Sequence, residues 1–395
     1  MPFQFVAYFK SMYGALFLPA PWTGSRIITY LFFLWVYPSA MLFNALTLLM
    51  DHLFFPGFKQ VQVKNPVFIV GNARSGTTYM HRLLALDSEH FNSFKLSDLV
   101  LISVGAKKFF QWLGGVDKRH LNGTLQKWLD NFQAMLLKEA DKVHKLRLSH
   151  PEEDEGVLIH CWASAFCSLV YPLPHMVQFE RFDEMPDAKR RKLMAHYKGC
   201  VQRQLYCNGG DHIQLLSKNP LFSSKLNSIF ETFPDARIIY MARTPYETVA
   251  SLHNMVDRIW NVQLQLDKSA QPREGLTQMC IYAYKYALQC LDAKPQDRSI
   301  IVKYEDLVHT PYAVVEQIYS RFNLPLTPRY IEELKRVTEK NKGYKSEHSY
   351  SLEAFGLTKE RVYRETNEVF DRFGFDPQGE FASGPKLAGD DVRVA

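Results

Sequence analysis

The sequence lacks the residue patterns that would tie its function to a metal ion or to a disulfide framework. Its six cysteines form no Cys-x-x-Cys pair, and its 13 histidines show neither His-x-x-x-His nor His-Glu-x-x-His spacing. We therefore expect no metal site. We also expect scattered, buried thiols, with a bridge such as Cys200–Cys207 as an alternative.

The sequence is also poor in net charge. Its 47 basic side chains against 41 acidic ones give a formal charge of +6 over 395 residues. That excess is too small to indicate a nucleic-acid-binding protein, and no such motif is present, but it suits an anionic ligand or an anionic membrane surface. Aromatic residues make up 14% of the chain, which is typical of a large core, an apolar pocket or a membrane-facing surface.

One long run without charge lies near the N-terminus. Residues 27–50 read IITYLFFLWVYPSAMLFNALTLLM between Arg26 and Asp51, long enough to cross a hydrocarbon core of ~30 Å as a helix that Pro38 would kink. Three interpretations stay open: one spanning helix, a kinked or re-entrant monotopic anchor, or a buried N-terminal helix of a soluble protein. The first two make residues 1–56 a membrane anchor.

The rest of the chain alternates short apolar runs with helical spacing. The runs that read as buried strands lie at residues 67–70, 213–216, 237–242 and 299–302. Such alternation predicts an α/β fold, with a central, mostly parallel sheet covered by helices on both faces. Residues 95–210 break the rhythm, and we expect them to form a helical insertion within a domain of residues 57–382. Residues 383–395 read as a flexible tail.

The first motif is the loop Gly71-Asn72-Ala73-Arg74-Ser75-Gly76-Thr77-Thr78, which follows the first strand. Its backbone N–H groups and the N-terminus of the next helix form a cradle for an anion. The separation of Gly71 and Gly76 matches a Walker A loop, but Thr77 replaces the lysine, and a cation stands earlier at Arg74. This departure disfavours a nucleoside triphosphatase.

The second motif pairs Arg243, at the end of the strand RIIYMA, with Ser251 about two helical turns later. Arg243 falls at the carboxyl edge of the sheet, where open α/β sheets bind ligands. A guanidinium and a hydroxyl can hold one phosphate together. Without further context the same pair is also compatible with a surface arginine and an ordinary helix serine.

Together, these segments resemble the sulfotransferases that use 3′-phosphoadenosine-5′-phosphosulfate (PAPS). GNARSGTTYMHRLL resembles their 5′-phosphosulfate loop, and FPDARIIYMARTPYETVAS resembles their 3′-phosphate segment. LLSKNP, VKYEDLVHTP and HSYSLEAFGL match later segments in order, so that the resemblance covers roughly residues 65–375. It implies a P-loop-type three-layer sandwich and a metal-free transfer of a sulfuryl group from PAPS to an acceptor.

The resemblance also implies roles for individual residues. Arg74, Ser75, Gly76, Thr77 and Thr78 would bind the 5′-phosphosulfate, and Arg243 and Ser251 the 3′-phosphate. Lys218 follows the strand IQLLS, where the family places a lysine near the bridging oxygen. A cation there stabilises the charge that develops on the departing phosphate. HSYSLEAFGL, with Lys342 or Lys345, is expected to lie over the cofactor.

The general base is the weakest part of the resemblance. Many relatives place a histidine two or four residues beyond this lysine, but Pro220 and Phe222 stand there, and Lys95 stands where other relatives have a glutamate. The remaining candidate is the acidic stretch PEEDE, where we favour Glu153 and then Asp154 as a base with a raised pKa.

Two other interpretations concern the same part of the chain. The acidic stretch also reads as an ordinary helix N-terminus, with acids at the positive end of the helix. His160 and His175 are secondary base candidates without positional support.

We thus predict a sulfotransferase whose acceptor is a small molecule or a membrane-derived lipid. The membrane-associated enzyme would most simply have its catalytic domain in the cytoplasm, or in the Golgi lumen if it were a eukaryotic type II protein. The alternatives are a P-loop kinase-like phosphotransferase and a non-catalytic membrane protein that retains the fold. The sequence does not define an oligomeric state.

Overall fold

The computed structural model describes residues 1–136, 147–266, 272–340 and 351–379. Five parallel strands form one sheet in the order β2-β3-β1-β4-β5. The strands span Val67–Gly71 (β1), Phe91–Asn92 (β2), Gln214–Lys218 (β3), Arg237–Ala242 (β4) and Ser299–Lys303 (β5). β1 lies in the middle, with Ile69 opposite Lys218 and Gly71 opposite Met241. The carboxyl ends of β3, β1 and β4 therefore meet at one edge.

The predicted parallel sheet is confirmed, and its four expected strands are present with ends shifted by at most two residues. β2 was not expected, because two residues are too short to show a pattern. The order of the strands could not be predicted from the sequence either, since strand pairing depends on contacts between distant segments.

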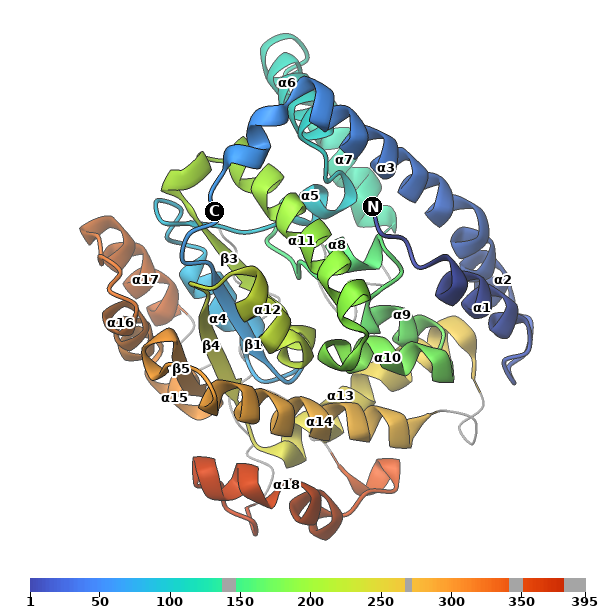
Figure 1. The fold of residues 1–395 in the computed structure, drawn as a ribbon, viewed down its shortest axis with the longest axis vertical. Helices are drawn as coiled ribbons and strands as arrows, with labels where there is room; N and C mark the ends of the chain where they lie inside the picture. Colours follow the sequence, from blue (N-terminus) through green and yellow to red (C-terminus); the bar gives the residue numbers. More distant parts are fainter. Residues whose placement is uncertain (137–146, 267–271, 341–350, 380–395) are drawn as a thin grey trace.

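Helices cover both faces of the sheet (Figure 1). The alternate side chains of β1 enter two cores, Phe68 and Val70 on one face and Val67 and Ile69 on the other. On the first face lie α11 Asp187–Cys207, α12 Leu226–Thr232, α13 Pro245–Ile259, α14 Arg273–Asp292 and α18 Lys359–Phe373. On the second lie α4 Thr77–Leu84, α15 Tyr304–His309, α16 Pro311–Arg321 and α17 Pro328–Lys340.

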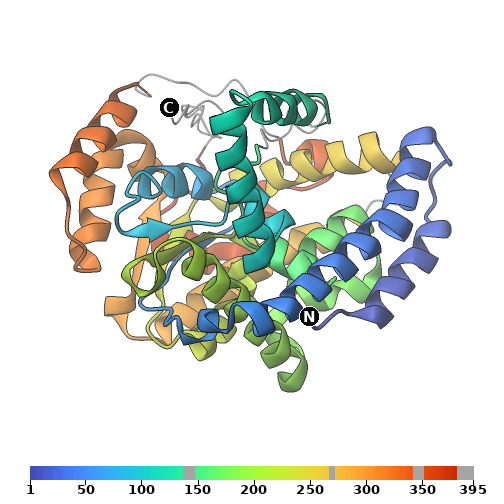
Figure 2. The ribbon, with the colours of Figure 1, turned by 90° about the horizontal axis from the view of Figure 1, so that it is seen from above.

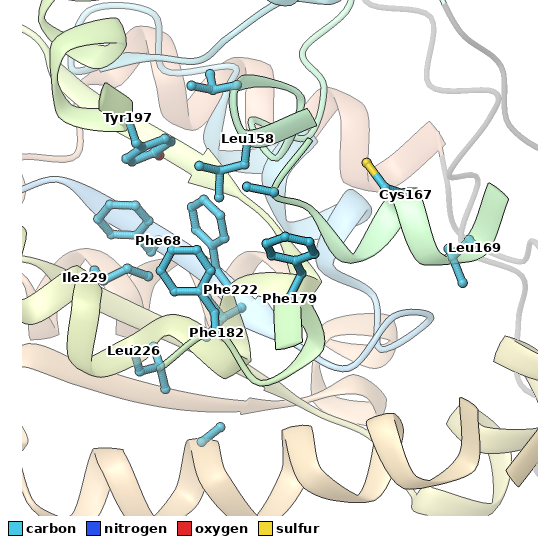
Figure 3. Close-up of a cluster of buried hydrophobic side chains, with 14 of the residues drawn as sticks. Phe68, Leu158, Cys167, Leu169, Phe179, Phe182, Tyr197, Phe222, Leu226 and Ile229 are labelled. Atoms are coloured by element: carbon cyan, nitrogen blue, oxygen red, sulfur yellow. The ribbon is translucent and has the colours of Figure 1, made fainter. Parts of the chain in front are cut away.

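Phe222 belongs to the first core. Figure 3 shows it with Phe68 of β1, Tyr197 of α11 and Ile229 of α12. The Phe222 ring lies 6.2 Å from the Phe68 ring and 5.4 Å from the Tyr197 ring, measured between ring centres. The position that some relatives use for a histidine is thus packed into the core in this chain.

The described residues between β2 and β3 are mainly helical. Their helices are α5 Leu96–Val100, α6 Val104–His120, α7 Thr124–Leu136, α8 Gly156–Ile159, α9 Ala165–Val170, α10 Val177–Glu180 and α11. All six cysteines are free thiols and five are buried, so the alternative Cys200–Cys207 bridge is not formed.

The apolar N-terminal run forms one long helix, Gly24–Phe54. It consists of α2 Gly24–Leu31, a π-helical segment Phe32–Val36 and α3 Tyr37–Phe54, and it follows the separate helix α1 Phe5–Leu16. The π segment ends at Val36, two residues before Pro38, and a proline removes a backbone donor and crowds the preceding turn. The helix therefore accommodates Pro38 by forming a π-helical turn, which is wider than an α-helical turn. Figures 1 and 2 show α1 to α3 along one outer side of the molecule.

Candidate active site

The loop between β1 and α4 is tightly wound at the carboxyl edge of the sheet. Gly71 and Gly76 have φ values of 141° and 88°. A Cβ atom on Gly71 would lie 2.5 Å from the carbonyl oxygen of Met241, so only glycine fits there. Ser75 Oγ donates a 2.6 Å hydrogen bond to the Asn72 carbonyl, which closes the loop on itself.

The loop ends at the N-terminus of α4, which begins at Thr77. The first N–H groups of an α-helix have no partner within the helix and carry its positive end. Thr77 is buried and Thr78 half-buried at this position. The loop and the helix start therefore present backbone donors of the kind that a phosphate or sulfate group requires.

Arg74 and Arg243 bring the two predicted anion motifs together. Nη1 of Arg243 donates a 2.8 Å hydrogen bond to the Arg74 carbonyl, and Arg74 Nε donates to Ser251 Oγ at 3.2 Å. Arg74 holds a left-handed conformation with φ of 72°, which is strained for a residue other than glycine. The bond from Arg243 helps to fix that carbonyl, so each motif stabilises the other.

The Arg243 side chain is oriented from several directions. Its Nε donates to Glu247 Oε2 at 2.9 Å, and its guanidinium carbon lies 4.0 Å from the centre of the Tyr304 ring. Tyr284 donates its hydroxyl to the Arg243 carbonyl at 2.6 Å. We did not predict Glu247, which lies in the first turn of α13, four residues after Arg243.

Lys218 and Glu153 form an ion pair on the other side of the loop. Lys218 ends β3, next to β1, and its Nζ lies 2.8 Å from Glu153 Oε1. The lysine side chain is 2% exposed, whereas that of Glu153 is 23% exposed. The Glu153 carboxylate therefore contacts a buried cation, while part of the Glu153 side chain remains accessible to solvent.

Asp154 and Glu155 point into the protein interior instead. Asp154 accepts hydrogen bonds from the hydroxyls of Tyr197 and Ser217, and Glu155 pairs with Lys225 at 3.2 Å. Burial raises the pKa of Asp154 to about 7, although both hydroxyl donors oppose the shift. These contacts hold the acidic segment against β3 and α11. Asp154 is therefore enclosed by its hydrogen-bond partners in the interior. Of the two base candidates, Glu153 is the one that contacts Lys218.

The alternative role of the acids as a helix N-terminus receives little support from the geometry. The residue before α8 is Glu155, and its side chain makes no capping hydrogen bond. Its carboxylate is directed to Lys225 instead, and Glu153 is directed to Lys218.

Lys95 lies beside the acidic segment, far closer than the sequence indicates. Its backbone pairs with Pro151, and the Glu152 N–H donates to the Phe94 carbonyl at 2.9 Å. The position where some relatives carry an acid and the segment that carries acids here are therefore neighbours in space. Sequence separation hides this relationship.

The two secondary histidine candidates are not grouped with Lys218. His175 contacts the N-terminal helix α1, where its Nε2 lies 3.0 Å from Ser11 Oγ. Burial lowers the pKa of His160 to about 4, which keeps it neutral. Lys342 and Lys345 lie outside the described residues.

His81 of α4 is a buried group that we did not predict. Its Nε2 lies 2.9 Å from Ser93 Oγ, and burial, together with the positive charge of Lys218, lowers its pKa to about 3. A neutral imidazole with so low a pKa is a poor proton acceptor at pH 7. The His81 side chain is therefore an uncharged polar group near Lys218.

Comparisons with known proteins show the family and the fold of this chain. The model of the sulfotransferase family matches residues 66–328. The omega-hydroxy-beta-dihydromenaquinone-9 sulfotransferases Stf3 of Mycobacterium bovis and Mycobacterium tuberculosis are each 25% identical over 328 residues, which cover 79% of this chain and 75% of theirs.

Two solved structures share the fold. Sulfotransferase STF9 from Mycobacterium avium superposes with a TM-score of 0.72 at 18% identity, covering 96% of this chain and 99% of that one. Sulfotransferase STF1 from Mycobacterium tuberculosis gives a TM-score of 0.68 at 18% identity, with 91% of each chain covered.

Proposed function

Since this chain belongs to the sulfotransferase family, we propose that it transfers the sulfuryl group of PAPS to a hydroxyl of a lipidic acceptor. One observation carries the assignment of the donor. The Arg243 guanidinium reaches the carbonyl of Arg74, so that two anion-binding motifs meet at one sheet edge. A nucleotide with phosphates on the 3′ and 5′ oxygens of one ribose is the kind of ligand that such a pair of neighbouring sites suits.

The donor groups fit this ligand. Backbone N–H groups of the loop, with Arg74, Ser75, Thr77 and Thr78, suit a phosphosulfate end, and Arg243 with Ser251 suits a phosphate end. Since Arg74 Nε already reaches Ser251 Oγ, a phosphate held at Ser251 would also lie close to Arg74. Arg74, Arg243 and Ser251 therefore favour the binding of a negatively charged group in the same place.

Lys218 and Glu153 suit the chemical step. As the acceptor oxygen forms its bond to sulfur and the bond from sulfur to the departing phosphate oxygen breaks, Lys218 stabilises the charge that this oxygen gains. Glu153 takes the proton of the acceptor hydroxyl. The ion pair holds the Glu153 carboxylate and the Lys218 ammonium next to each other, and an ammonium has further donors for the departing oxygen.

Support for a lipidic acceptor comes from two sides. The Stf3 relatives are named for a dihydromenaquinone derivative, which is a lipid. This chain in turn exposes large apolar side chains along its N-terminal helices, such as Phe9, Trp35 and Leu49. We propose that the protein associates with a membrane through this region, with its catalytic domain on the cytoplasmic face.

The decisive experiment compares sulfur-labelled lipids and metabolites from cells that carry the wild type, Lys218→Ala or Arg243→Ala. A labelled product that requires both residues supports the proposal. Thermal stabilisation by 3′,5′-ADP but not by ATP with magnesium excludes the kinase alternative. Stabilisation by 3′,5′-ADP without any labelled product would favour a non-catalytic protein.

A further inference from the structure

The outer side of the N-terminal helices is an apolar surface. We call the exposed side of α1 and of the helix Gly24–Phe54 the apolar face. Its members include Phe9 (63% exposed), Trp35 (66%), Phe43 (51%), Leu49 (67%) and Leu53 (77%). Few soluble monomers expose a contiguous apolar surface of this kind, because it favours association with a partner or a membrane.

The opposite side of the same helix is bound to the catalytic domain. Tyr37 donates its hydroxyl to the Ile159 carbonyl at 2.6 Å, and Asn44 Nδ2 donates to the Val100 carbonyl at 3.2 Å. One turn from the helix end, Asp51 Oδ2 lies 2.8 Å from Arg203 Nε, and both side chains are buried. These contacts recur on one stripe of the helix, at residues 37, 44 and 51, so α3 lies along the domain.

A spanning orientation conflicts with this stripe. A helix that crosses a bilayer alone is surrounded by hydrocarbon, which would separate Asp51 from Arg203 and leave charged and polar groups without partners. Keeping the contacts would instead draw the charged domain into the hydrocarbon. The length of Gly24–Phe54 permits a span, but its contacts favour a position parallel to the membrane surface.

Within α1 to α3 and α6, the exposed charges are of one sign. Residues 1–60 and 104–120, which form α1 to α3 and α6 and are described in full, contain two acids, Asp51 and Asp117. Both are buried, and their carboxylates accept hydrogen bonds from backbone N–H groups at the starts of α6 and α7. The exposed charged side chains of these residues are Lys10, Lys59, Lys108, Lys118 and Arg119.

From these observations we propose that the apolar face lies in the plane of an anionic membrane leaflet and that Gly24–Phe54 does not cross it. The apolar side chains enter the headgroup boundary, and the cations meet anionic lipid headgroups. The charge complementarity between these cations and anionic headgroups favours a membrane as the occupant of the face. This inference rests on the proposed membrane association and specifies its geometry.

Vesicle flotation tests the surface. We expect the full chain to float with vesicles that contain phosphatidylglycerol and to bind pure phosphatidylcholine vesicles at least tenfold more weakly. The double variant Phe43→Glu/Leu49→Glu should lose at least tenfold in binding, whereas Ile301→Glu, an exposed apolar residue of β5, should bind like the wild type. Equal binding by the double variant, or no flotation of the wild type, would overturn the proposal.

Cysteine labelling tests the orientation. Ser25→Cys and Gln60→Cys place thiols at exposed positions at or just beyond the two ends of the helix, and their modification by a membrane-impermeant maleimide can be followed by peptide mass spectrometry in intact and lysed cells. Equal behaviour of the two sites supports the in-plane helix. Labelling of one site alone in intact cells shows a span and refutes it.

These outcomes are separable from the proposed function. The double variant should retain its thermal stabilisation by 3′,5′-ADP, since the apolar face contributes no group to the nucleotide site. A protein that floats, shows equal labelling and still forms no sulfated product would leave the in-plane geometry intact while removing the proposed reaction.

Discussion

The guanidinium carbon of Arg243 lies 4.0 Å from the centre of the Tyr304 ring. The same ring packs against the phosphate loop, since a Cβ atom on Gly76 would lie 2.9 Å from Tyr304 Cδ2. Tyr304 begins α15, directly after β5. Its position connects Arg243 to the loop.

Replacing Tyr304 should weaken the binding of 3′,5′-ADP. Tyr304→Leu removes the cation–π contact and should raise the Kd about tenfold, whereas Tyr304→Phe keeps the ring and should bind like the wild type. Calorimetric titration measures both. Tyr312→Leu is the control, because Tyr312 lies on α16 and stacks with Lys335 instead. Unchanged affinity in Tyr304→Leu would remove Tyr304 from the site.

Arg243→Lys should raise the KM for PAPS about 10- to 100-fold, a loss of about 1.4–3 kcal/mol, because an ammonium cannot reproduce the planar fork. Arg237→Lys is a matched control, since Arg237 begins the same strand at the opposite edge of the sheet. Steady-state kinetics at varied PAPS checks both variants. Similar effects of the two substitutions would show a general loss of stability.

Glu153→Gln should lower kcat by about 10²–10⁴-fold, because an amide cannot accept the acceptor proton. Its affinity for 3′,5′-ADP should stay close to that of the wild type. Asp154→Asn should change the melting temperature more than kcat, because Asp154 is buried between Tyr197 and Ser217. If the two variants exchanged these effects, the base would be Asp154.

The stability of the protein should depend on the ionisation of Asp154. Burial raises its pKa to about 7, so the folded state holds a proton that the unfolded state releases near pH 4. Its contribution is therefore complete at low pH and is lost as the pH rises from about 4 to about 7. Urea unfolding of the wild type and Asp154→Asn should show the wild type losing stability relative to the variant across this window.

The wild type must be compared with Asp154→Asn because the shifted pKa of His81 changes the stability with pH in the opposite direction. Its pKa is lowered to about 3, so stability falls when the pH drops below the ordinary value for histidine. A difference between wild type and Asp154→Asn that stayed constant from pH 4 to pH 8 would contradict the raised pKa of Asp154.

Asp51→Asn should cost about 3–5 kcal/mol in unfolding free energy, because Arg203 would remain buried without its charged partner. Chemical denaturation measures the loss. Glu89→Gln offers a control, since its pair with Arg329 is exposed. The same contact shows that deleting residues 1–55 would strip Arg203 and the buried side of the helix, so such a deletion cannot test membrane binding cleanly.

The parts of the fold that follow local rules could be predicted. β1, β4 and the loop 71–78 are set by a run of buried apolar residues and by glycines that a tight turn requires, and all of this is visible in the sequence. The location of Arg243 at the carboxyl edge followed from the end of its strand. Its proximity to the loop 71–78 depends on the pairing of β4 with β1, which the sequence does not show.

Other features depend on contacts between distant segments. Glu153 and Asp154 are adjacent in a segment without regular structure, so no period indicates which one faces Lys218. The pairing of Lys95 with Pro151 joins segments more than fifty positions apart. The side of Gly24–Phe54 that packs on the domain could not be predicted either, because polar residues such as Asn44 are few in this run and the partner of Asp51, Arg203, belongs to α11.

The order of the strands has a consequence for how such an enzyme can diversify. Lys218, the loop and Arg243 come from three consecutive neighbours in the sheet, about 5 Å apart from strand to strand, so the proposed donor site is built on adjacent strands of one sheet. The segment with Glu153 enters from the long excursion between β2 and β3. Under the proposed roles, mutations in that excursion would change the side of the site that carries Glu153 and leave Lys218, the loop and Arg243 unchanged.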